Sequence, residues 1–272
     1  DDKANVGHEY ENSYRGKVQN RKVDVDFMPM YQLSYLQYAN GVKSYVASGE
    51  SVDNFNKQNK KENAASHVAY STLQITCNPK SLDEQTTKSY FAMIDSLSQI
   101  IQQSKDLRRD KDVLIQRAVA YSVVQNFYDA ENDLSAYLQV DSLSSLAYWQ
   151  RAVCQSMLED YDRSQGNNQQ FKDLRVLGDL DKAISLDHSN AYLYYNRANI
   201  YALQKNYSKA IADYDKAIDL DPRLAEAYYN RGLAYIYSKK TEQGIKDLSK
   251  AGELGLVDAY SAIKKYRPKA GK

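Results

Sequence analysis

The sequence has few of the residues that end helices or build turns. It contains only 11 glycines and 4 prolines among 272 residues, roughly half of the usual combined share of about 12%. So few turn formers argue against a many-stranded sandwich or barrel and favour long helices. No stretch approaches the roughly 18 consecutive apolar residues that a membrane-spanning helix needs. The sequence therefore predicts a helical chain without membrane insertion.

The residues that usually carry chemistry are also scarce. Two cysteines, Cys77 and Cys154, cannot build a disulfide framework or a Cys-rich zinc site. Three histidines, His8, His67 and His188, are too scattered to suggest a metal or catalytic cluster. The 36 basic and 35 acidic residues leave a net charge of +1, which gives no overall attraction to nucleic acid. No nucleophile-elbow or phosphate-loop motif is present. We therefore predict no enzymatic activity, no cofactor, no metal and no nucleic-acid partner.

What the sequence does contain is a repeat with a period of 34 residues. Two columns of charged residues mark it: Arg117, Arg151, Arg197 and Arg231, and then Asp133, Asp179, Asp213 and Asp247. Successive members are 34 residues apart, except for one separation of 46 in each column. A period of 34 is typical of a two-helix repeat. The 12 extra residues fall between Arg151 and Asp179, so the polar stretch 160–171 is predicted to be an inserted loop.

These copies resemble tetratricopeptide repeats. In the third copy the family's aromatic, small, Tyr, Ala, aromatic, Ala and Pro positions are taken by Tyr194, Ala198, Tyr201, Ala210, Tyr214, Ala217 and Pro222. The resemblance implies a mainly α fold, a right-handed α-solenoid of helical hairpins. It places four repeats at 111–144, 145–190 (with the inserted loop), 191–224 and 225–258. Stacked copies bury the apolar faces that a single hairpin would leave exposed.

The flanking segments differ in kind from the repeats. Residues 81–110 predict an amino-terminal helix that packs on the first repeat, and residues 259–267 predict a helix that caps the last repeat. Residues 1–80 predict a small β or extended region, with strands within 23–38 and 67–77 and a mobile loop at 48–63. Pro29 indicates that the first strand is interrupted or lies on an edge.

The segment that begins at Arg15 and ends at Tyr35 is also similar to one found in larger bacterial multi-TPR proteins. This similarity implies that the chain is the carboxy-terminal part of a longer bacterial protein. It favours the periplasm or cell envelope over the cytoplasm.

The arginine and aspartate columns have two interpretations. Four arginines could present a ladder of positive charge to an anionic ligand. Alternatively, each arginine could pair with the aspartate of its own repeat and hold the two helices together. We favour these structural ion pairs, because every copy has one of each residue and a guanidinium can bind a carboxylate through two bonds.

The family resemblance implies that the first helix of each repeat lines a concave face. The predicted partner-binding residues on that face are Trp149, Val153, Tyr192, Tyr195, Asn199, Tyr229, Leu233 and Tyr237. Trp and Tyr dominate interface hot spots because they offer a large contact area with a polar end. The alternative is that these rings simply pack between neighbouring helices or against the amino-terminal strands.

Three functions follow from these patterns. The leading hypothesis is a non-catalytic scaffold whose aromatic groove binds an extended peptide or a helix of a protein partner. The second is a carbohydrate-binding module that stacks Tyr and Trp on the sugar rings of a glycan. The third is purely architectural: residues 1–80 fill the groove, and the chain caps a longer solenoid.

Overall fold

The computed structural model describes the chain except for residues 1–26, 39–69, 78–80, 109, 165–172 and 268–272. Its described part contains two short strands and ten helices, so the predicted mainly α, repeat-built fold class with a small amino-terminal sheet is confirmed. The predicted loop at 48–63 lies outside the described residues.

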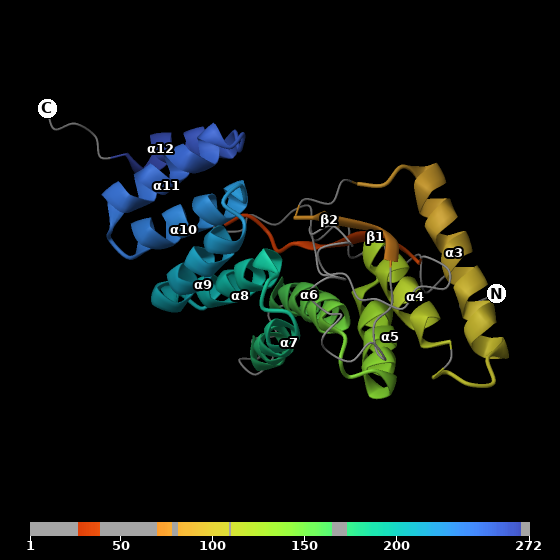
Figure 1. Cartoon of the computed structure of the whole chain (residues 1–272). Coiled ribbons are helices and arrows are strands. Elements are labelled where there is room, and N and C mark those ends of the chain that lie inside the picture. Colours follow the sequence, from red (N-terminus) through yellow and green to blue (C-terminus); the bar gives the residue numbers. More distant parts are fainter. Residues whose placement is uncertain (1–26, 39–69, 78–80, 109, 165–172, 268–272) are drawn as a thin grey trace, which may run out of the picture. The chain divides into compact units, whose positions relative to one another are not determined.

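The chain divides into two compact units (Figure 1). Of the described residues, those between 32 and 187 belong to unit 1, and residues 27–31 together with those between 188 and 267 belong to unit 2. In unit 1 the elements are β1 (Gln32–Tyr38), β2 (Tyr70–Thr76), α3 (Glu84–Gln103), α4 (Lys111–Val123), α5 (Phe127–Val140), α6 (Ser145–Ser164) and α7 (Asp173–Leu186). In unit 2 they are α8 (Ala191–Leu203), α9 (Tyr207–Leu220), α10 (Ala225–Tyr237), α11 (Thr241–Glu253) and α12 (Asp258–Tyr266).

The hairpin turns explain why the helices pair in sequence order. Gln125, Lys205 and Lys239 each adopt a positive φ, between 60° and 65°, two residues after the last residue of the first helix of a hairpin. The N–H of the next residue then bonds the carbonyl five residues back at 2.8 Å, as in Asn206 to Tyr201. This left-handed turn ends a helix and satisfies its last carbonyls. Asn206 then caps α9 by accepting a bond from the Lys209 N–H.

The second repeat departs from this plan. Helix α6 has 20 residues, whereas α4, α8 and α10 have 13 each. The insertion expected as a loop at 160–171 therefore begins as a helical extension that runs to Ser164, and the rest of the stretch lies outside the described residues. Nothing in the polar sequence of 160–164 prevents a helix, since it contains neither Gly nor Pro.

The amino-terminal part of unit 1 combines a sheet with a helix. Strands β1 and β2 pair antiparallel, and Leu33 lies opposite Ile75. Helix α3 packs on α4 through a small cluster in which Ile94 meets Ala120 and Val124. The first strand begins only at Gln32, although the sequence suggested a strand within 23–38. Residues 27–31 form no strand because their backbone groups bond to side chains of helices instead.

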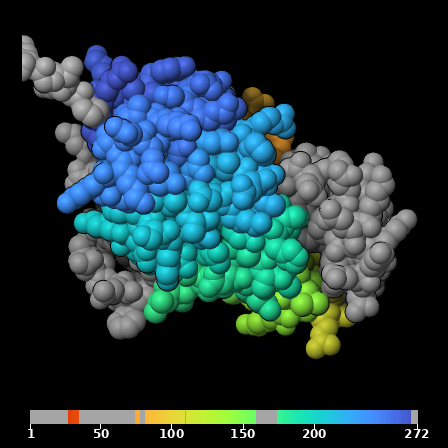
Figure 2. All heavy atoms as spheres, turned by 60° about the vertical axis from the view of Figure 1, so that its left-hand side comes forward, coloured from red at the N-terminus to blue at the C-terminus, as the bar shows by residue number. Residues whose placement is uncertain are grey.

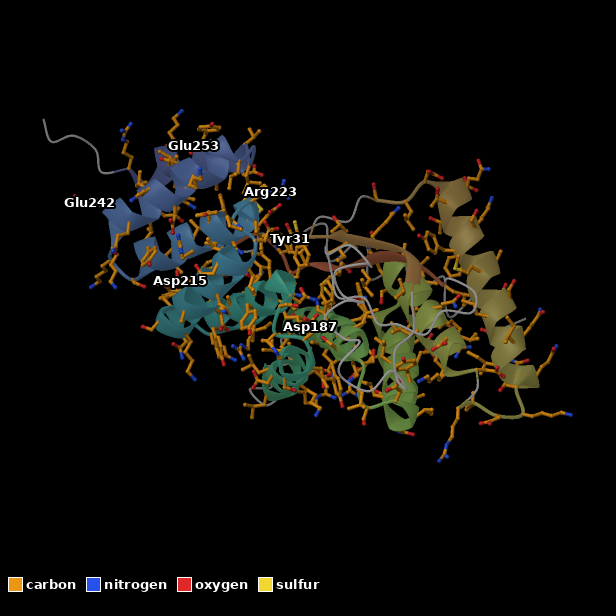
Figure 3. All side chains as sticks on the ribbon, in the orientation of Figure 1. Tyr31, Asp187, Asp215, Arg223, Glu242 and Glu253 are labelled. Carbon is orange, nitrogen blue, oxygen red and sulfur yellow. The ribbon has the colours of Figure 1, made fainter. Side chains whose placement is uncertain are left out.

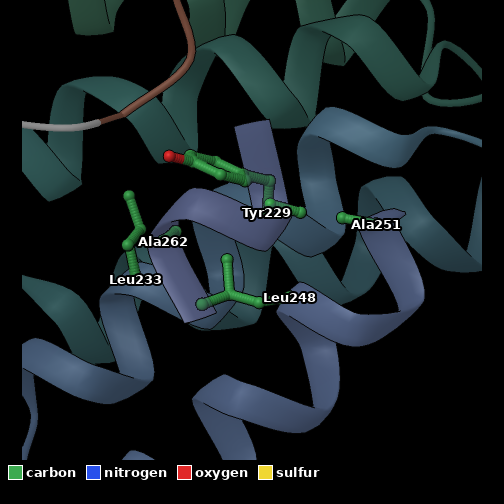
Figure 4. Packing of buried hydrophobic residues seen from close by; sticks show 6 residues of the cluster. Tyr229, Leu233, Leu248, Ala251 and Ala262 are labelled. Carbon is green, nitrogen blue, oxygen red and sulfur yellow. The ribbon is translucent and has the colours of Figure 1, made fainter. Parts of the chain in front are cut away.

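One hydrophobic core cluster of unit 2 lies between its last three helices. Tyr229, Leu233, Leu248, Ala251, Ala259 and Ala262 are buried together where α10, α11 and α12 meet (Figure 4). Helices α10 and α11 approach so closely that a Cβ on Gly244 would lie 2.5 Å from the Gly232 carbonyl oxygen. The helices of unit 2, coloured cyan to blue, form one closely packed body (Figure 2). Its core is therefore built mainly by the helices themselves.

Candidate functional site

Every repeat contains one arginine–aspartate pair with the same geometry. The arginine Nε and Nη2 donate to the two carboxylate oxygens at 2.7–2.8 Å in Arg117–Asp133, Arg151–Asp179, Arg197–Asp213 and Arg231–Asp247. A tyrosine ring lies 5.4–5.7 Å from each guanidinium, contributed by Tyr121, Tyr148, Tyr194 and Tyr228 in turn. Each pair links the first helix of a repeat to the second and is largely shielded from water.

The remaining guanidinium nitrogen links neighbouring helices. Arg151 Nη1 donates to Ser135 at 3.3 Å, and Arg231 Nη1 donates to Asp215 at 2.7 Å. Asp215 lies on α9, the second helix of the preceding repeat (Figure 3). Burial lowers the pKa of Arg231, but its bonds to Asp247 and Asp215 outweigh this effect and raise it. With all these partners inside the fold, the arginines offer no free ladder to an anion.

The predicted binding residues of unit 2 lie on α8 and α10, and the surface that these two helices present to residues 27–31 is called the wall. The chain itself covers this wall. Residues 27–31 lie against α8 and α10, and Tyr195, Asn199, Tyr229 and Leu233 are all buried. Tyr192 and Tyr237 remain only half-buried. The expectation of an open aromatic groove is therefore wrong for these two repeats. Apolar ring faces gain stability when they leave water, and a segment of the same chain covers them.

Two asparagines hold the backbone of this segment by both of its polar groups. The Met28 N–H donates to Asn230 Oδ1 at 2.7 Å, and Asn230 Nδ2 donates to the Met28 carbonyl at 3.0 Å. Likewise, the Tyr31 N–H donates to Asn196 Oδ1 and Asn196 Nδ2 donates to the Tyr31 carbonyl, both at 2.8 Å. A side-chain amide thus replaces the strand that would otherwise satisfy these buried groups.

Each of these asparagines, together with the residue whose N–H and carbonyl it bonds, is called a clamp. The spacing of the two clamps matches the spacing of the repeats. Asn196 and Asn230 are 34 residues apart and occupy the same place in successive repeats, while Met28 and Tyr31 are three residues apart. Three extended residues span at most about 10 Å, and packed helices lie about 8–10 Å apart. In the third and fourth repeats an extended chain therefore meets one asparagine per repeat, at residues three apart. The segment runs opposite to the repeat order, because Met28 meets α10 and Tyr31 meets α8.

A network of uncharged hydrogen-bonding groups supports the clamp that Asn230 forms on Met28. Asn199 Nδ2 donates to the Met28 carbonyl at 3.0 Å, and the Tyr195 hydroxyl donates to the Pro29 carbonyl at 3.0 Å. The Tyr214 hydroxyl, whose pKa is raised well above its usual value by burial, donates to Asn199 Oδ1 at 2.6 Å. Tyr214 is thus a protonated donor that orients the Asn199 amide toward the segment.

Aromatic rings hold the two ends of the segment. The Tyr31 ring (labelled in Figure 3) lies 4.4 Å from the Tyr192 ring and 5.2 Å from the Tyr195 ring, between centroids. The Phe27 ring meets Tyr237 edge-on at 5.7 Å. The distances of 5.2 and 5.7 Å suit edge-to-face aromatic pairs, and the closer Tyr31–Tyr192 pair is tilted. Three of the four predicted tyrosines thus contact a peptide segment, and that segment belongs to this chain.

The two predicted binding residues of unit 1 are not on an open surface either. Trp149 and Val153 are 0% and 1% exposed, because α5, α7 and β1 surround α6. Trp149 is therefore wrong as a surface contact residue. Beside it, Gln150 Oε1 accepts a bond from the Leu33 N–H at 3.1 Å. Gln150 thus contacts the backbone of β1 as the asparagines contact that of residues 27–31.

These amides form a column that the sequence reasoning missed. Gln116, Gln150, Asn196 and Asn230 each stand directly before the repeat arginine. The signal was available in the same alignment that revealed the arginines. The column has little predictive value by itself, because Gln and Asn are ordinary surface residues and nothing in the sequence indicates that a distant backbone lies against them.

Unit 1 also contains a cavity of about 380 Å³ between the sheet and the ends of α3 to α6. Its walls include Gln32, Gln74, Tyr90, Ser122 and Phe127, and none of the described residues that line it is charged or a histidine. Such a lining provides no acid–base pair. Burial raises the pKa of the nearby Cys154 thiol to about 12, so this cysteine is no nucleophile at neutral pH.

The described residues include neither a metal-ligand cluster nor a membrane-spanning helix. They contain no group of three or more His, Cys, Asp or Glu side chains placed to hold a metal ion. Nor do the described helices include one that is both long and apolar enough to cross a membrane.

Comparison with known families matches this architecture. Tetratricopeptide repeat families match residues 180–212 and 225–254, and a further TPR repeat family matches residues 198–236. Residues 180–254 are therefore tetratricopeptide repeats. Curated proteins include no significant match to this TPR chain.

Solved structures share the fold. A crystal structure of MamA is 21% identical, with a TM-score of 0.54 over 69% of this chain and all of that one. A double mutant of MamA RS-1 is 17% identical, with a TM-score of 0.52 over 62% of this chain and 87% of that one. A thermophilic TPR protein of Thermus thermophilus, TTC0263, is 17% identical, with a TM-score of 0.49 over 67% of this chain and 92% of that one. At these identities the likeness concerns the fold alone.

Proposed function

We propose that this TPR protein is a non-catalytic protein-interaction scaffold, and that the inner wall of its third and fourth repeats binds extended polypeptide. In this chain residues 27–31 occupy that wall as an intramolecular ligand. The proposal keeps the predicted class of partner, a protein or peptide, and replaces the open groove with an occupied one.

One observation carries the proposal. Asn196 and Asn230 each bond both the N–H and the carbonyl of one residue, Tyr31 and Met28 respectively, at 2.7–3.0 Å. These bonds involve the main chain of the segment and none of its side chains. A different extended peptide therefore offers the same N–H and carbonyl groups. A wall that holds one extended segment in this way is chemically suited to hold another.

The uncharged groups that contact residues 27–31 indicate which kind of peptide the wall can bind. Among the described residues, those that hydrogen-bond residues 27–31 or place a ring against them are amides, hydroxyls and rings, namely Asn196, Asn199, Asn230, Tyr192, Tyr195 and Tyr237. None of them is a lysine or arginine that would pair with a terminal carboxylate. We therefore expect an internal, uncharged stretch of a partner and not its carboxy-terminus.

Affinity capture from the host, followed by mass spectrometry, tests the proposal with three forms of the full chain. The first is native, the second carries Phe27→Ala with Tyr31→Ala to weaken the internal ligand, and the third adds Asn196→Ala with Asn230→Ala to the second. Partners should be enriched on the second form and lost from the third. Asn206→Ser, at a cap outside the wall, is the matched control and should capture like the native chain. Equal recovery on all forms would exclude this wall as the partner site.

The architectural function is the second candidate, and a specific observation favours it. The segment is already seated, with Tyr31 buried between Tyr192 and Tyr195. On that hypothesis residues 27–31 never leave the wall, and the second form captures nothing more than the native chain. The glycan hypothesis has less support, because Trp149 is buried and the tyrosine rings face other rings of the chain.

A further inference from the structure

We infer that a segment of a partner protein can displace residues 27–31 from the wall. We further infer that this partner segment has the sequence pattern aromatic–apolar–Pro–x–aromatic. This inference rests on the proposed function and names the ligand class of the same wall. The chain's own sequence there is Phe27-Met28-Pro29-Met30-Tyr31.

The pattern follows from which side chains the wall touches. Phe27 and Met28 pack against the core cluster of α10, α11 and α12, and Tyr31 inserts between Tyr192 and Tyr195. The first, second and fifth positions are therefore read by apolar contact. Pro29 is exposed, and the wall uses only its carbonyl.

The third position favours proline for a backbone reason. Every N–H donor that the wall asparagines accept comes from Met28 or Tyr31, so the missing N–H of a proline at position 29 costs no bond there. Its fixed φ also holds the chain extended before binding, which reduces the conformational entropy lost when the segment docks. A preceding residue is biased toward the extended region as well, which suits Met28.

Exchange is supported by the way unit 2 is built. The six residues of its core cluster come from α10, α11 and α12, and Phe27 and Met28 only pack on the edge of that cluster. The clamp bonds join residues 165 and 202 positions apart in the chain, so the segment is not part of either helical hairpin. Undocking it exposes the wall and withdraws the buried Tyr31 ring, but removes no member of that six-residue cluster.

An internal ligand lowers the apparent affinity for an external one. A segment that is docked nine-tenths of the time leaves a tenth of the chains free to bind, which weakens apparent binding about tenfold. A partner with the same pattern must therefore compete with residues 27–31. The wall is in this sense self-inhibited.

The test uses a fluorescent peptide with the sequence of residues 26–32, DFMPMYQ, and a control peptide, DAMPMAQ, that lacks both rings. Fluorescence anisotropy measures binding to the full chain, native or carrying Phe27→Ala with Tyr31→Ala. DFMPMYQ should bind the variant at least about tenfold more tightly than the native chain. The variant should bind DAMPMAQ at least about tenfold more weakly than DFMPMYQ, and adding Asn230→Ala should weaken DFMPMYQ binding by a similar factor.

A second measurement needs no variant. Excess DFMPMYQ should accelerate hydrogen exchange in the native chain over residues 27–31, because displaced Met28 and Tyr31 amides lose their asparagine partners, and DAMPMAQ should not. If both peptides bind the variant equally, the aromatic pattern is wrong, while a wall that binds extended backbone stands. The inference is overturned if neither peptide binds a variant that melts like the native chain and hydrogen exchange at residues 27–31 is unchanged. Residues 27–31 then do not leave the wall. The capture experiment decides the proposed function independently.

Discussion

The arginine column and the amide column stand side by side in the sequence, yet they make opposite kinds of contact. Arg117, Arg151, Arg197 and Arg231 each bond an aspartate of their own repeat. One position earlier, Gln150, Asn196 and Asn230 bond the backbone of residues 28–33, far away in the chain. Adjacent residues on a helix point about 100° apart, so one column faces the paired helix while the other faces the wall.

The difference separates what holds a repeat together from what the repeat holds. The ion pairs join two helices that any hairpin of this family must join, and they recur in all four copies. The amides depend on an occupant that appears once. We expect changes to the first column to act on folding, and changes to the second to act on the docked segment.

The largest expected effect is that of Asp213→Ala. It leaves the Arg197 guanidinium partly buried without the carboxylate that takes two of its bonds. Breaking a buried pair on one side costs about 3–5 kcal/mol; since Arg197 retains some contact with water, we expect a value near the lower end of that range. Urea unfolding of the full chain measures the loss. A cost below about 0.5 kcal/mol, the range of an ordinary surface substitution, would contradict a structural role for this pair.

The next effect is that of Asn196→Ala, which removes both bonds to the buried Tyr31 backbone. An unsatisfied buried group costs about 1–3 kcal/mol, and the loss should be accompanied by faster hydrogen exchange at residues 27–31. Gln116→Ala is the matched control from the same column. The Gln116 side chain forms no hydrogen bond with the described part of the chain, so its replacement should change stability by less than about 0.5 kcal/mol. Equal losses for the two variants would mean that the column does not act through the segment.

A smaller effect is expected for Asp215→Ala. Asp215 bonds Arg231 at 2.7 Å but is 48% exposed, and Arg231 keeps both of its bonds to Asp247. Exposed ion pairs contribute about 0.2–1 kcal/mol, and added salt should reduce even that contribution. Compared by urea unfolding, Asp247→Ala should cost several times more. The reverse order would show that the link between repeats matters more than the pair within one.

The smallest effect is an expected lack of reaction at Cys154. The thiol is fully buried beside Ser122, and burial raises its pKa to about 12. Iodoacetamide at pH 8 should leave Cys154 unmodified in the folded chain and alkylate it in urea. Because Asn196→Ala acts on unit 2, it should not change this protection in unit 1. Rapid labelling of native Cys154, read by mass spectrometry, would contradict the packing around α6.

The sequence predicted the helices far better than it predicted the site. The 34-residue period, the capping helix and the helix before the first repeat follow from local patterns of apolar, small and turn residues. The contact between Phe27 and Tyr237 has no such pattern, since 210 residues separate the two rings and each ring would equally suit a core or a surface. Trp149 illustrates the same limit, because a tryptophan at a wall position reads as an interface residue until its neighbours are known.

The amino acids alone determined the hairpins, their paired charges and the regular columns, because each depends on partners at a fixed and short separation along the chain. Only the tertiary structure decided that the wall of the third and fourth repeats is occupied, and by which residues. An extended segment that is held through its backbone leaves almost no trace in its side chains, so its destination is settled by which apolar surface it can reach and cover.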